Sequence, residues 1–159
     1  MAFFFCQGEA VAQTSSYGAL QAAYLFNFAK YITWPQESEE FIIGIYGESE
    51  ILDELQSILG EKKAGGRVIV IRVITSVDQV DGCRIVYLPG SNTKNLSVLK
   101  EAIGHKSILV VTEEDLIRRG ASISFVVEDD RLRFKLKTKS LSDAGLKASN
   151  GLLKLAIQF

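Results

Sequence analysis

The feature that most constrains the fold is residues 17–35, a helix-length run that ends at Pro35. Two sets of apolar side chains cover most of its circumference at 3.6 residues per turn: Leu20, Tyr24, Phe28, Tyr31 and Trp34 on one side, and Ala22, Leu25, Phe26, Ala29 and Ile32 over much of the rest. Such a helix is normally buried in a core or at an interface. We therefore predict a helix over 17–35 that covers a sheet, with partial burial in a dimer or partner contact as the alternative.

A membrane span is the competing interpretation of this run. A spanning helix needs about 20 largely uncharged residues. Asn27 and Lys30 interrupt the run, and Pro35 ends it. These three residues argue against a span.

Short apolar segments alternate with helical patterns after Pro35. The expected strands cover residues 41–47, 67–75, 84–89 and 107–112, and the expected helices follow at 51–63, near 93–104 and near 113–120. This alternation predicts a single-domain α/β fold with a mostly parallel sheet, right-handed crossovers and flanking helices. Any ligand crevice should lie at the carboxyl ends of the strands, near Gly47, Gly90 and Glu113.

Residues 122–139 predict a C-terminal antiparallel hairpin with its turn at Glu128 to Asp130. One face is apolar, and the opposite face carries a basic residue at every second position: Arg131, Arg133, Lys135, Lys137 and Lys139. Alternation along a strand points all five the same way. The basic row is either an edge strand protected by charge against unwanted pairing, or a docking face for an acidic partner or an anionic membrane surface.

The sequence offers no recognisable catalytic machinery. It contains no nucleophile–base pair, metal-ligand set or phosphate loop, and Gly65 and Gly66 precede a strand, unlike a P-loop. His105 stands alone, and the acids at 113–115 are adjacent residues at a helix start, which are usually solvated. A net charge of −1 gives no bulk attraction to nucleic acid. We predict a non-enzymatic protein with no cofactor, no metal and no nucleic-acid partner.

Residues 1–12 differ from the rest of the chain. Ala10-Val11-Ala12 before Gln13 has the small-x-small pattern of a signal-peptidase site, and residues 2–6 are typical of the end of an apolar signal region. We predict the remnant of an export signal at 1–12 and a domain over 13–159. A persisting disordered apolar terminus and a lipid anchor on Cys6 are the alternatives. Cleavage would leave Cys83 without an intramolecular disulfide partner.

Several segments, in order along the chain, resemble the YfiR family. They are AAYLFNFAKYITWP, FIIGIYGES, GGRVIVIRVIT, DGCRIVYLP, SILVVTEED, RRGASISFVVEDDRLRF and AGLKASNGLLKLA, and together they cover about residues 17–157. The resemblance implies a periplasmic repressor of a membrane diguanylate cyclase, controlling cyclic-di-GMP and biofilm formation. It also implies a homodimer and an outer-membrane lipoprotein that sequesters the repressor. Family members often pair a cysteine at the position of Cys83 with one at the position of Gly44, which this chain lacks.

Two sets of site residues follow from these considerations. The predicted partner-binding set lies on the hairpin: Phe125, Arg131, Arg133, Phe134 and Lys135. The alternative function is a periplasmic small-molecule sensor, whose predicted ligand-binding set is Tyr24, Asn27 and Trp34.

Overall fold

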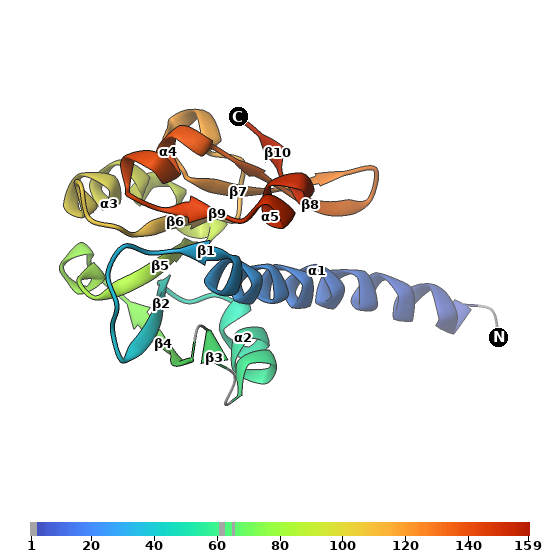
Figure 1. The fold of residues 1–159 in the computed structure, drawn as a ribbon. Helices are drawn as coiled ribbons and strands as arrows, with labels where there is room; N and C mark the ends of the chain where they lie inside the picture. The colour runs from blue at the N-terminus through green and yellow to red at the C-terminus, as the bar shows by residue number, and fades with distance from the viewer. Residues whose placement is uncertain (1–2, 61–62, 65) are drawn as a thin grey trace.

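Parallel strands β4, β2, β5, β6 and β7 form the middle of an eight-stranded sheet, ordered β10-β8-β7-β6-β5-β2-β4-β3 (Figure 1). This computed structural model describes residues 3–60, 63–64 and 66–159, with side chains from residue 17 onward. The strands are β2 (Glu40–Tyr46), β3 (Lys63–Ala64), β4 (Arg67–Ile74), β5 (Cys83–Leu88), β6 (Leu109–Thr112), β7 (Ile123–Glu128), β8 (Arg131–Leu136) and β10 (Ile157–Gln158). The predicted α/β fold with a mostly parallel sheet is confirmed.

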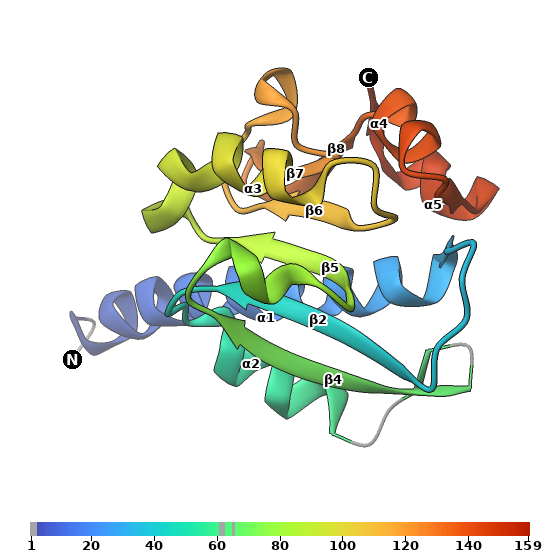
Figure 2. The same ribbon diagram turned by 90° about the vertical axis from the view of Figure 1, so that its left-hand side faces the viewer.

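Helices cover both faces of this sheet (Figure 2). They are α1 (Phe3–Tyr31), α2 (Ile51–Leu59), α3 (Leu96–Ile103), α4 (Thr138–Asp143) and α5 (Asn150–Leu155), with 3-10 turns η1 (Val77–Val80), η2 (Gly90–Asn95) and η3 (Ile117–Arg119). The core cluster on one face joins the sheet to α1, α2, α4 and α5. A second cluster on the other face joins it to α3 and η1. Side chains alternate along each strand, so the near-continuous apolar strands supply both clusters.

The end of α1 differs from the prediction. The helix ends at Tyr31, and Ile32–Thr33 form strand β1, which pairs with β9 (Lys147–Ala148) in a separate two-stranded antiparallel sheet. Because a residue that precedes proline disfavours the helical conformation, Pro35 already constrains the chain at position 34. The prediction of a helix to residue 35 was therefore wrong in its last turn.

The buried side of α1 also differs in part from the predicted stripe. Leu20 and Tyr31 are 44% and 43% exposed, whereas Leu25 and Phe28 are fully buried. The helix packs where it meets the sheet and α2, and this choice of side depends on tertiary contacts. In the described part of the chain, no helix is both long and apolar enough to cross a membrane.

The hairpin β7–β8 forms as predicted, with a tighter turn. Glu128 belongs to β7 and pairs with Arg131, leaving Asp129 and Asp130 as the two turn residues, at φ 51° and 60°. Two central residues with positive φ are typical of a type I′ turn, whose twist suits a hairpin. Aspartate tolerates this left-handed conformation better than most residues.

The predicted row of five basic residues is shorter in the structure. Strand β8 ends at Leu136, so Lys137 leads into α4 and Lys139 lies on that helix, paired with Asp143. Only Arg131, Arg133 and Lys135 keep strand alternation. Strand β10 pairs with β8 at Lys135 and Leu136, so the free edge of β8 is its first part.

Candidate partner and ligand surfaces

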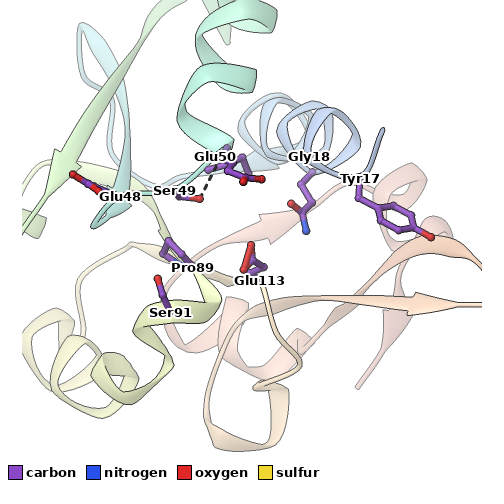
Figure 3. Close-up of a pocket in the computed structure, with 10 residues that line it drawn as sticks. Tyr17, Gly18, Glu48, Ser49, Glu50, Pro89, Ser91 and Glu113 are labelled. Atoms are coloured by element: carbon purple, nitrogen blue, oxygen red, sulfur yellow. Dashed lines mark hydrogen bonds between the residues drawn. The ribbon is translucent and has the colours of Figure 1, made fainter. Parts of the chain in front are cut away.

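The carboxyl ends of the strands border a surface cavity of about 670 Å³, where the crevice was predicted (Figure 3). Its lining comes from α1, the β2–α2 connection, and the segments after β5 and β6: Tyr17, Gly18, Gln21, Glu48, Ser49, Glu50, Ile51, Pro89, Ser91 and Glu113. The ends of parallel strands meet at one edge of the sheet, which brings these distant segments together. Of the predicted crevice residues, Glu113 lines the cavity.

Glu113 is held in place by hydrogen bonds from the protein itself. The Gly90 backbone N–H donates to Oε1 at 2.9 Å, and the Tyr87 hydroxyl donates to Oε2 at 3.2 Å. Burial raises the pKa of Tyr87, and the neighbouring Glu113 carboxylate raises it further. Both carboxylate oxygens therefore have donors within the fold, which indicates a structural role.

The start of α2 also finds a hydrogen-bond acceptor and negative charges within the chain itself. The Ser49 hydroxyl accepts a hydrogen bond from the Ile51 backbone N–H at 3.3 Å, while Glu50 occupies the N-cap position. Asp53 and Glu54 stand in the first turn of the helix, where acids complement the helix dipole. This arrangement disfavours an anionic ligand at the carboxyl edge.

The outer face of β8 presents the predicted basic residues to solvent. Arg131 and Arg133 are exposed. Lys135 is partly buried and pairs with Asp115 at 2.6 Å. Its Nζ also lies 5.2 Å from the centroid of the Phe159 ring. The basic surface is thus strongest at Arg131 and Arg133, where no partner carboxylate lies within salt-bridge distance among the described residues.

Two neighbours of this basic surface, Phe159 and Arg118, were not predicted from the sequence. Phe159 is 45% exposed, and the guanidinium of Arg118 lies 5.6 Å from its ring centroid. The Phe159 backbone N–H bonds to the Leu136 carbonyl at 2.9 Å, which fixes the ring beside β8. No local pattern could have placed residue 159 beside residue 118, because the contact depends on the pairing of β10 with β8.

Phe125 and Phe134, also predicted as partner-binding residues, lie in the core. They are 2% and 0% exposed, and they pack against Tyr24 and Phe28 of α1. The Phe134 ring centroid is 5.2 Å from that of Tyr24 and 5.0 Å from that of Phe28, both in edge-to-face geometry. These two side chains can affect a partner only by fixing the hairpin against α1, while the arginines on the opposite face remain accessible.

The predicted ligand-binding residues are divided between two places. Tyr24 and Asn27 line a second surface hollow of about 450 Å³, together with Tyr31 and residues of α5. Trp34 is 6% exposed and packs edge-to-face against Phe41, with ring centroids 4.9 Å apart. Trp34 does not line this hollow because the chain leaves the helix at Tyr31.

Cys83 is a buried free thiol on β5. Burial raises its pKa, an effect that the neighbouring Arg72 opposes. A Cβ at position 44 would lie 3.0 Å from Cys83 Sγ, so Gly44 does face this cysteine across the β2–β5 pair. The structure describes side chains from residue 17 onward, so the predicted alternative of a lipid anchor on Cys6 falls outside them. No group of three potential metal-ligating side chains gathers in the described part of the chain.

Comparison with protein families gives one result that bears on function. A family model described as YfiR/HmsC-like matches residues 18–157. The chain belongs to the YfiR/HmsC-like family. No curated protein matches the sequence. Membership of the YfiR/HmsC-like family points to a periplasmic regulatory role in cyclic-di-GMP signalling, and this family is regulatory and non-catalytic.

Proposed function

We propose that this chain is a non-enzymatic periplasmic repressor, which binds the periplasmic part of a membrane diguanylate cyclase and thereby lowers cyclic-di-GMP and biofilm formation. The observation that carries the proposal is the family match over residues 18–157. The role as an exported protein includes removal of residues 1–12. A homodimer and an outer-membrane lipoprotein that sequesters the repressor belong to the same proposal.

The contact surface of the proposal is the outer face of β8, centred on Arg131 and Arg133. Both side chains are exposed, and they lie opposite Glu128 and Val126 on the neighbouring strand. Complementary charge across an interface steers association and suppresses wrong partners. An acidic surface on the cyclase would therefore be recognised here. The core packing of Phe125 and Phe134 against α1 holds the two arginines at a fixed spacing.

Repression then works through a shift of populations. A bound protein can bias its partner only by binding one conformation more tightly than the other. The repressor binds the inactive conformation of the cyclase better than the active one. Sequestration by the lipoprotein lowers the concentration of free repressor and restores cyclase activity.

The test reverses the charge of the proposed contact surface. The double variant Arg131→Glu/Arg133→Glu and a control, Lys63→Glu/Lys154→Glu, change the net charge equally at exposed positions. Each full chain is used to capture proteins from detergent-solubilised membranes of its own source, followed by mass spectrometry. We expect the wild type and the control to retain a membrane diguanylate cyclase, and the arginine variant to lose it with unchanged thermal stability. Equal retention by all three would overturn the assignment of this surface.

The second candidate function is a periplasmic small-molecule sensor. It is favoured by the position of Tyr24 and Asn27 in one hollow of about 450 Å³. Substituting Asn27→Ala should abolish binding of any metabolite taken up there and leave capture of the cyclase unchanged. A metabolite screen that gives no thermal shift in the wild type would count against the sensor.

A further inference from the structure

Aromatic and basic side chains gather at the opposite edge of the sheet, where the parallel strands begin. Phe41, at the start of β2, is fully buried and contacts Trp34 edge-to-face at 4.9 Å between ring centroids. The guanidinium carbon of Arg67, the first residue of β4, lies 5.8 Å from the centroid of the same Phe41 ring. One phenylalanine thus joins the indole ring and the guanidinium group at this corner of the core.

A bulge near the start of β5, at the same edge of the sheet, contains a second arginine. Ile42 pairs with Cys83 and the next residue, Ile43, pairs with Ile85, so Arg84 is an extra residue on β5. Bulges bend a strand and re-aim a side chain. Residue Arg84 as a whole is only 7% exposed, which is rare for an arginine without an ionic partner.

Two donors of this corner are buried without acceptors in the described chain. Within the described residues, Trp34 Nε1 and Arg67 Nη1 are buried without a hydrogen-bond partner, and neither Arg67 nor Arg84 forms a salt bridge. Burial lowers the pKa of the Arg84 guanidinium, and the positive charge of Arg67 lowers it further. A buried polar group without a partner costs free energy, and a buried unpaired charge costs more.

Arg72, further along β4, is an arginine whose hydrogen bonds are made within the fold. Arg72 Nη1 donates to the Asp81 carbonyl at 2.8 Å and to the Gln79 carbonyl at 3.1 Å. Its charge is therefore accommodated by the protein's own carbonyl groups. Arg67 and Arg84 have no such acceptors in the described chain, so an acceptor from outside fits them better than a purely structural role.

We propose that Trp34, Arg67 and Arg84 form a binding site for an oxyanion, the carboxylate or phosphate group of a ligand. Guanidinium groups present several N–H donors in a planar fork that matches both kinds of oxyanion. The indole N–H adds a neutral donor. This site lies at the amino edge of the sheet, away from the outer face of β8, and it stands whether or not the chain represses a cyclase.

Trp34 makes the site directly testable, because it is the only tryptophan of the chain. The full chain is titrated with inorganic phosphate and, separately, with acetate, against chloride at equal ionic strength, while tryptophan fluorescence and thermal unfolding are recorded. We expect one of the two anions to give a saturable change in fluorescence and a rise in melting temperature that chloride does not give. A stronger response to phosphate assigns a phosphate ligand, and a stronger response to acetate assigns a carboxylate. No specific response to either anion would overturn the proposal.

Three variants and a matched control locate the effect. Arg84→Leu and Arg67→Leu should each weaken anion binding by about tenfold or more, since hydrogen bonds to charged groups are the strong ones. Arg133→Leu removes the same charge from an exposed position and should leave binding unchanged. Trp34→Phe keeps an aromatic ring but removes the N–H donor, and should reduce the thermal shift. An anion response that survives in both Arg84→Leu and Arg67→Leu would contradict the site.

Discussion

The two edges of the parallel sheet differ in whether their buried polar groups find hydrogen-bond partners within the fold. At the carboxyl edge, the oxygens of Glu113 accept from Tyr87 and from Gly90 within the same chain. At the amino edge, Arg67 and Trp34 each bury a donor that has no acceptor in the described chain. A surface cavity of about 670 Å³ lies at the carboxyl edge. A hollow lined by satisfied groups can be structural, whereas the buried donors without acceptors are the groups that the proposed oxyanion would satisfy.

The largest expected effect on stability comes from substituting Phe41, a fully buried core residue at the amino edge. Phe41→Ala should destabilise the protein by about 3–5 kcal/mol, because a fully buried ring that packs against Trp34 is removed. Urea unfolding measures this loss. Phe41→Leu retains much of the volume and should lose clearly less stability. Equal losses of stability in the two variants would show that the aromatic ring, which the Arg67 guanidinium contacts, matters more than the filled volume.

The carboxyl edge should respond strongly to the loss of its acceptor. Glu113→Ala leaves the Tyr87 hydroxyl and the Gly90 N–H unpaired, which should cost about 1–3 kcal/mol. Glu114→Ala at the exposed neighbouring position should stay within about 0.5 kcal/mol of the wild type. Chemical unfolding of both variants measures the difference. Similar stabilities would remove the contrast drawn between the two edges.

Alkaline pH tests the ionisation of Tyr87 at the same edge. Burial raises the pKa of Tyr87 in the folded state, so above about pH 10 the unfolded chain loses this proton while the folded chain keeps it. The stability contribution is complete below the unfolded pKa and falls by about 1.4 kcal/mol per pH unit above it. Tyr87→Phe should show a shallower decline of unfolding free energy with pH. Parallel declines would show that Tyr87 ionises normally.

The smallest effect is expected from the exposed ion pair at the amino edge. Lys106 pairs with Asp81, but their side chains are 51% and 71% exposed. Such pairs contribute about 0.2–1 kcal/mol, so Lys106→Ala should change stability by no more than this. Thermal unfolding at low and high salt provides the measurement. A larger loss would show that charge at this edge is neutralised within the fold after all.

Much of the architecture could be predicted from local patterns. The buried strands β2, β4, β5 and β6 are continuous apolar runs, and the alternation with helices implies parallel pairing. The hairpin followed from the alternation of Leu132, Phe134 and Leu136 with basic residues. The predicted end of α1 was wrong because the helix gives way to β1. The partner of β1 is β9, more than 110 residues further along the chain, and helical periodicity cannot indicate such a pairing.

The candidate sites were less predictable for the same reason. The alternation placed Arg131 and Arg133 correctly on one face of β8, because period-two geometry is local. It could not show that Lys137 and Lys139 leave the strand, nor that Phe125 and Phe134 pack under α1. The arginines at positions 67 and 84 belong to no motif, and only the tertiary structure shows the unpaired donor of Arg67 and the burial of Arg84.

The sequence by itself determined the class of fold, the hairpin with its basic face, and the family that residues 18–157 match, since each depends on residue order and local periodicity. The tertiary structure decided which charges find partners. Hydrogen bonding and desolvation depend on atoms brought together from distant segments, as in Tyr87 with Glu113. Contacts between distant segments give the Glu113 carboxylate its donors at the carboxyl edge. The donors of Trp34 and Arg67 are left without acceptors in the described chain, and the proposed anion would bind them.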